Sequence, residues 1–128
     1  MKLNEIFYDM FKNMDKDTLA SSPCRIDVET YIKSLKNYEN ILTLDIRTGE
    51  ELGFTEFKAG KVFNIPMNEL FSDKNIEKLD KQANIIVLCH TGIRAVAVAT
   101  LLNLLGFNAK ALKGGWVSIA EYLSAKTS

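Results

Sequence analysis

The stretch Ile85-Ile86-Val87-Leu88-Cys89-His90-Thr91-Gly92-Ile93-Arg94 joins a run of four apolar residues to a polar turn that contains glycine. A short apolar run rich in β-branched residues is typical of a strand covered on both faces. From Ile93 to Leu105 the chain is apolar nearly all round and too long for a strand, which predicts a buried helix. The stretch therefore predicts a strand, a loop and a helix, the unit from which α/β folds are built.

Cys89 follows the last residue of the predicted strand. In an open α/β sheet, ligands bind at the carboxyl ends of the strands, and the N–H groups that begin the next helix favour anions. Loop amides and Arg94 around Cys89 would stabilise its thiolate, the form of cysteine that acts as a nucleophile. The alternative is a buried, inert cysteine, which is common inside cells. The order strand, Cys, loop, Arg and helix favours the nucleophile.

Three further stretches accompany this loop in the order Leu44-Asp45-Ile46-Arg47 with Glu51 behind it, Asn64-Ile65-Pro66, and Leu112-Lys113-Gly114-Gly115-Trp116. Together with Cys89-His90-Thr91-Gly92-Ile93-Arg94, they resemble the motifs of rhodanese-type sulfurtransferases. The resemblance covers about residues 25–124. It implies an α/β fold with a five-stranded parallel sheet and helices on both faces.

The resemblance also implies a division of roles in the site. The catalytic residues would be Cys89 and Arg94, the substrate-facing ones His90, Thr91, Gly92 and Ile93, and the supporting ones Asp45, Arg47 and Glu51. Cys89 would take sulfane sulfur from a small anionic donor such as thiosulfate, and cyanide, a thiol or a partner protein would then remove it. For the supporting residues, the alternative is an ordinary surface ion pair worth ~0–1 kcal/mol. His90 could act as a general base, but loop amides can already hold the thiolate.

The composition of the chain argues against several other classes of function. The chain has 128 residues, sixteen basic and sixteen acidic, and net charge +0, so bulk charge favours neither nucleic acid nor an anionic membrane as a partner. Its two separated cysteines, Cys24 and Cys89, and its single histidine predict neither a metal site nor a C-x-x-C pair. We expect no cofactor. Without a signal peptide or a long apolar span, the sequence indicates a protein of the reducing cytoplasm.

The N-terminus lies outside the resemblance. Residues 3–14 carry apolar side chains at spacings of three and four, which predicts an amphipathic helix. We expect this helix and a connection over residues 1–23, followed by one domain over residues 24–128. The apolar stripe needs a cover, which could be this domain, a second copy or a partner, so the chain would be a monomer or a homodimer through the helix.

Further elements follow from apolar patterns and from Gly and Pro positions. The predicted strands lie at 26–28, 41–45, 85–88 and 108–112, and the predicted helices at 30–36, 73–82 and 93–105, with a final helix that places Trp116, Ile119, Tyr122 and Leu123 on one face. From Glu50 to Pro66 the chain departs from its relatives: the usual His and Pro are missing from Phe57 to Asn64. This loop commonly borders the substrate entrance, so the identity of the sulfur donor or acceptor stays open.

Two other functions compete with sulfur transfer. Cys-dependent phosphatases and arsenate reductases also use a Cys-loop-Arg anion cradle, but they typically place five residues between Cys and Arg, whereas Cys89 and Arg94 are separated by four. The shorter ring suits the terminal sulfur of a persulfide better than a tetrahedral phosphate. The other alternative is a sulfur carrier or partner-binding module without small-molecule turnover, which the presence of Cys89 and Arg94 does not exclude.

Overall fold

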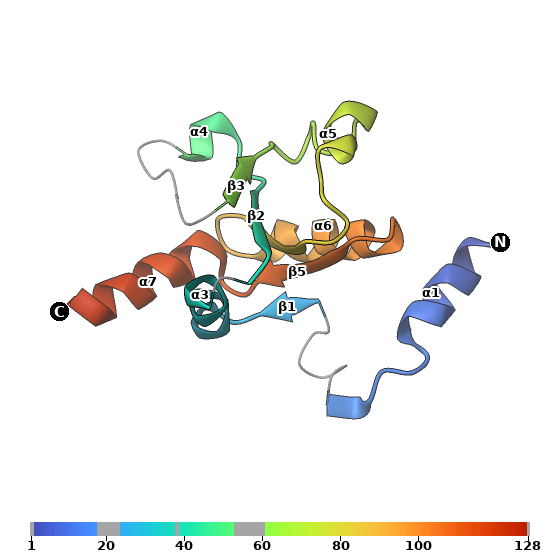
Figure 1. The fold of residues 1–128 in the computed structure, drawn as a ribbon, viewed down its shortest axis with the longest axis horizontal. Coiled ribbons are helices and arrows are strands. Elements are labelled where there is room, and N and C mark those ends of the chain that lie inside the picture. Colours follow the sequence, from blue (N-terminus) through green and yellow to red (C-terminus); the bar gives the residue numbers. More distant parts are fainter. Residues whose placement is uncertain (1, 18–23, 38, 53–60, 128) are drawn as a thin grey trace.

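The computed structural model describes residues 2–17, 24–37, 39–52 and 61–127 (Figure 1). In chain order the elements are α1 (Leu3–Phe11), β1 (Arg25–Ile26), α3 (Val28–Lys36), β2 (Ile41–Asp45), α4 (Gly49–Leu52), β3 (Lys61–Asn64), α5 (Asp73–Glu77), β4 (Asn84–Leu88), α6 (Ile93–Leu104), β5 (Asn108–Leu112) and α7 (Gly115–Thr127). Strands alternate with helices, as parallel pairing requires, because each parallel strand needs a long crossover from the one before.

The strands form one five-stranded sheet in the order β1-β5-β4-β2-β3, and every neighbouring pair is parallel. The predicted α/β class and five-stranded parallel sheet are therefore confirmed. β4 lies at the centre, between β5 and β2, and its register places Asp45 of β2 opposite Leu88. The carboxyl ends of β2 and β4 therefore meet at one edge of the sheet, next to Cys89.

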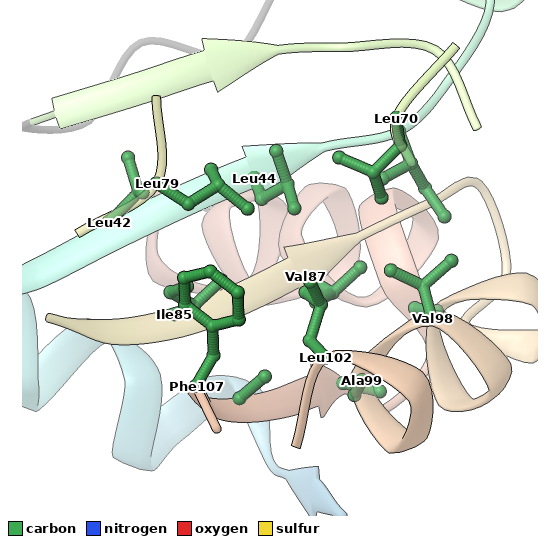
Figure 2. Close-up of a cluster of buried hydrophobic side chains, with 14 of the residues drawn as sticks. Leu42, Leu44, Leu70, Leu79, Ile85, Val87, Val98, Ala99, Leu102 and Phe107 are labelled. Carbon is green, nitrogen blue, oxygen red and sulfur yellow. The ribbon is translucent and has the colours of Figure 1, made fainter. Parts of the chain in front are cut away.

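Helices cover both faces of the sheet, as predicted. Figure 1 shows α3 beside α7, which it also contacts, and α6 packs on β4 and β5. Successive side chains of a strand point to opposite faces, and β4 follows this rule. Ile85 and Val87 belong to the core cluster that includes Leu102 of α6 (Figure 2), whereas Ile86 and Leu88 belong to the cluster on the other face. Fully burying each such side chain stabilises the fold by roughly 1.5–3 kcal/mol.

Two elements had no counterpart in the sequence-based prediction. The stretch from Glu50 to Pro66 was interpreted as a loop. α4 overlaps the start of this stretch, and β3 lies within it. β3 is an edge strand with exposed ends at Lys61 and Asn64, so it lacks the apolar run of a covered strand. Its strand conformation depends on pairing with β2, which local sequence does not encode. Residues 53–60, which include Phe57 and Lys58, lie outside the described part of the chain.

Some predicted boundaries were wrong by a few residues. The first strand ends at Ile26, because Asp27 caps α3 by accepting a hydrogen bond from the Thr30 N–H at 2.8 Å. This hydrogen bond is the main cause that lowers the pKa of Asp27. α5 ends at Glu77 and does not continue to residue 82. In α7, the predicted common face holds only in part, since Ile119 is buried but Leu123 is 46% exposed.

The N-terminal helix is present but ends at Phe11, three residues earlier than predicted. Figure 1 shows α1 apart from the sheet. The side chains of Leu3, Phe7 and Phe11 are exposed, at 65%, 40% and 38%. The apolar stripe of α1 is therefore largely uncovered within one chain.

Candidate active site

The loop that begins at Cys89 connects β4 to α6 and folds back on the cysteine sulfur. The Gly92 N–H donates a hydrogen bond to Cys89 Sγ at 3.0 Å, and Gly92 adopts φ +95, a conformation that side chains other than glycine rarely take. Cys89 itself is only 1% exposed. The sulfur thus lies inside the loop, at the N-terminus of a 12-residue helix, where partial positive charge favours an anion.

The other predicted substrate-facing residues form the outer rim of the loop. His90 and Thr91 are exposed, and Ile93 is 80% exposed, while Arg94 is half-buried in the first turn of α6. Cys89 is therefore buried inside the loop, while His90, Thr91 and Ile93 lie at its surface. Among the described residues, no hydrogen bond joins the His90 side chain to Cys89 Sγ, which accepts the Gly92 N–H.

The first residues of α7 hold the Cys89 loop through backbone hydrogen bonds. The Trp116 N–H donates to the Cys89 carbonyl at 2.8 Å, and the Val117 N–H donates to the His90 carbonyl at 3.2 Å. A Cβ atom at Gly115 would overlap both carbonyl groups, at 2.6 Å from the His90 oxygen and closer to that of Cys89. The turn at Gly115 therefore lies directly against the backbone of the loop that begins at Cys89.

Asp45 and Arg47 form a buried ion pair behind the loop. Arg47 is 0% exposed and Asp45 2%, and Arg47 donates from Nε to Oδ1 at 3.0 Å and from Nη2 to Oδ2 at 2.9 Å. Asn64 Nδ2 donates to the carbonyl oxygens of both residues, at 3.0 and 3.2 Å. The surface-pair alternative is therefore wrong for these two residues. Glu51 lies in α4, but its side chain is outside the described part of the structure.

Trp116 connects this ion pair to the loop that begins at Cys89, which the sequence alone did not reveal. The Arg47 guanidinium carbon lies 5.2 Å from the centre of the Trp116 ring, within the range of a cation–π interaction. The same tryptophan packs against the core cluster and holds the Cys89 carbonyl through its backbone N–H. The apolar pattern of the final helix indicated only that Trp116 shares a face with Ile119, Tyr122 and Leu123. The position of Trp116 directly after Gly114-Gly115 was the available signal, because that turn touches the loop.

A family model for the rhodanese-like domain matches residues 28–122. The chain belongs to the rhodanese-like domain family. Membership supports a sulfur-transfer module in general terms, and the matched range includes the loop that begins at Cys89. The match begins at Val28, the first residue of α3, so α1 and β1 lie outside it. The predicted boundary between residues 23 and 24 stays a prediction.

Solved structures of rhodanese-like proteins have the same fold. A rhodanese-related protein from Thermoplasma volcanium is 28% identical, with a TM-score of 0.60 over 76% of this chain and 91% of its own. A Bacillus halodurans protein is 25% identical, with a TM-score of 0.63 over 99% of this chain and 84% of its own. The reduced CoADR-RHD protein of Bacillus anthracis is 23% identical, with a TM-score of 0.66 over 79% of this chain. This chain covers only 17% of that protein. No curated protein matches.

Among the described residues of this rhodanese-like domain, no cluster of three or more His, Cys, Asp or Glu side chains could hold a metal ion. Both cysteines are free thiols, and Cys24 is buried, with its sulfur 3.7 Å from Asn103 Nδ2. None of the helices in the described ranges has the length and apolar content needed to cross a bilayer.

Proposed function

We propose that this protein is a sulfurtransferase that moves sulfane sulfur from a small anionic donor such as thiosulfate to cyanide, a thiol or a partner protein. The observation that carries the proposal is the position of Cys89 Sγ. It accepts the Gly92 N–H at 3.0 Å inside the loop that begins α6. A cysteine held by a backbone N–H at a helix N-terminus can carry negative charge without a metal.

The reaction has two displacement steps. In the first, the Cys89 thiolate attacks the outer sulfur of thiosulfate, a new S–S bond forms, and sulfite leaves with the electron pair of the bond that breaks. In the second, the acceptor attacks the outer sulfur of the Cys89 persulfide, and the electron pair returns to Sγ. Each stage leaves negative charge on sulfur inside the loop. The Gly92 N–H is aimed at that position, and Arg94, the second residue of α6, supplies positive charge in the first turn of the helix.

The buried framework explains why the loop can act without rearranging its backbone. Hydrogen bonds from Trp116 and Val117 hold two of its carbonyl groups. Gly92 also packs closely on the β5–α7 turn, because a Cβ atom added there would lie only 3.0 Å from the Gly114 nitrogen. A preorganised donor costs no reorganisation when charge develops. Because Cys89 is 1% exposed, the donor must enter past the rim of His90 and Thr91.

The decisive experiment is intact-protein mass after incubation with thiosulfate and then with cyanide. The native protein should gain one sulfur atom and lose it to cyanide, and Cys89→Ser should gain none, because an alcohol is not ionised near neutral pH. Cys24→Ser is the matched control, since it removes the other buried thiol, and it should load normally. If the native protein never gains sulfur and hydrolyses an aryl phosphate efficiently, this proposal is wrong and the phosphatase alternative takes its place.

A sulfur carrier would also load with sulfur and would also lose it to cyanide, so this experiment tests the covalent step and leaves the physiological acceptor open. We further propose a cytoplasmic location, supported by the two free thiols, which persist in a reducing compartment. We propose a homodimer through α1 as the alternative to a monomer, because the apolar stripe of that helix is largely exposed.

A further inference from the structure

A cleft of about 380 Å³ lies directly beside the catalytic loop. Its described lining consists of Arg25, Thr91, Gly92, Ile93, Val96, Lys113 and Gly114. Two of these residues are cations, and none of the described lining residues is a carboxylate. The volume falls within the range of small-molecule sites, about 300–1,000 Å³, and gives room for a ligand larger than thiosulfate.

Sheet pairing brings the two cations together at the carboxyl edge of the sheet. Arg25 of β1 pairs with Ala111 of β5, and the Lys113 N–H donates to the Ile26 carbonyl at 2.8 Å. Arg25 is half-buried and Lys113 is exposed. Asp27 is an acidic group near Lys113, which contributes to the lowering of its pKa, and its carboxylate caps α3 by accepting the Thr30 N–H. Asp27 is not among the residues that line the cleft.

The opposite wall of the cleft is the catalytic loop itself. Gly92 lines the cleft and also donates its N–H to Cys89 Sγ, so a ligand in the cleft lies against the residue that holds the reactive sulfur. Ile93, which is 80% exposed, and Val96 add an apolar side, and Thr91 adds a hydroxyl group. Cations beside apolar carbon suit an organic anion, with its carbon chain on the apolar side.

We propose that this cleft binds the anionic end of a low-molecular-weight thiol that serves as the sulfur acceptor. Arg25 and Lys113 hold its carboxylate or phosphate group, and the thiol end reaches over the rim of the loop to the persulfide. The guanidinium group matches either anion through paired N–H donors, and the ammonium group adds a point charge. This inference rests on the proposed function, because it assigns an acceptor class to the same site.

The transfer step is a displacement at sulfur. The thiol loses its proton to solvent, and its thiolate attacks the outer sulfur of the Cys89 persulfide. A bond forms between the acceptor sulfur and the outer sulfur while the bond to Sγ breaks. The electron pair returns to Sγ, and the acceptor leaves as a persulfide. No oxidant or reductant is consumed.

The kinetic test compares thiol pairs that differ in charge. Mercaptosuccinate against thioglycerol tests carboxylates, and phosphopantetheine against pantetheine tests a phosphate. In Lys113→Gln, the KM of the charged acceptor that fits the site should rise roughly fivefold, as expected for loss of one exposed charge contact. The KM of its neutral counterpart should not change. Lys110→Gln is the matched control, because Lys110 is an exposed lysine of β5 that does not line the cleft. Arg25→Lys keeps the charge but removes the paired donors, so it should raise the same KM.

A binding measurement separates this inference from the proposed function. The S-methyl derivatives of mercaptosuccinate and phosphopantetheine cannot accept sulfur, so calorimetric titration of the unloaded protein reports on the cleft alone. At least one should bind the native protein more tightly than Lys113→Gln. If the protein never forms a persulfide, the proposed function fails while this measurement still reports on the cleft. If the persulfide forms but Lys113→Gln weakens neither binding nor the use of charged thiols, the inference is overturned.

Discussion

Replacing Gly115 with alanine tests whether the start of α7 positions the Cys89 loop for the proposed reaction. Gly115 adopts φ +58, and an added Cβ would lie 2.6 Å from the His90 carbonyl oxygen. Real Cβ atoms essentially never approach closer than 3.0 Å, so this oxygen must move by at least 0.4 Å (3.0 minus 2.6), and the Cys89 carbonyl must move further. Both groups are backbone atoms of the loop, so no flexible side chain can absorb the shift.

The expected loss of rate follows from that displacement. If ~1 Å of misplacement costs about 10²-fold, 0.4 Å costs roughly sixfold, which is a lower bound because the Cys89 carbonyl moves more. The assay is single-turnover formation of the Cys89 persulfide, followed by intact mass after rapid quenching with acid. Gly115→Ala should load at least about sixfold more slowly than the native protein. Thermal unfolding of the same sample should show that the variant is still folded.

Gly106→Ala is the matched control. Gly106 also has a positive φ, +97, but a Cβ there would meet only the Lys81 side chain, at 3.7 Å. In both variants an alanine must adopt a left-handed backbone conformation, which costs roughly 1–2 kcal/mol of folding stability. Only Gly115→Ala also displaces the loop. Equal loading rates in the two variants would refute the argument that the close approach at Gly115 sets the geometry of the site.

Three further predictions concern the framework and the N-terminus. Arg47→Met should cost about 3–5 kcal/mol in urea unfolding, because it leaves the Asp45 carboxylate buried and unpaired, and adding Asp45→Asn should recover part of that loss. If the effects of Arg47→Met and Asp45→Asn on the free energy of unfolding simply add, this prediction is wrong. Burial raises the pKa of Tyr31 from 10.0 to about 12, so stability present below pH 10 should fall as the pH rises toward 12. Tyr31→Phe should show a shallower fall in pH-dependent unfolding, and an equal slope would disprove the assignment. Deletion of residues 1–17 should change the oligomeric state seen by light scattering and leave persulfide formation intact, whereas a folded deletion unable to load sulfur would give α1 a role in the chemistry.

Hydrophobic patterning predicted the central strand β4, which is apolar and almost fully buried on both faces. It also predicted the helix α6, but as a buried one, and this was only partly right. α6 packs on the sheet through Ala95, Val98, Ala99 and Leu102, whereas Ile93 and Leu101 are 80% and 46% exposed. The edge strand β3 carries no comparable pattern, because its outer residues face solvent and its conformation comes from pairing with β2. The predicted helix over residues 73–82 begins at Asp73 as expected but ends early, at Glu77. Leu79 is buried, but it follows the end of α5 and reaches the core from a turn.

The sequence by itself determined the order strand, Cys89, loop and helix, because the apolar run, the glycine and the arginine are neighbours in the chain. Only the tertiary structure decided what surrounds that loop. The contact of Arg47 with Trp116 and the pairing of Arg25 with Ala111 join residues separated by more than sixty positions. Such contacts depend on the strand order β1-β5-β4-β2-β3, which brings distant segments to one edge of the sheet. Local periodicity carries no information about that order, because it reports which face of an element is buried and not which element lies beside it.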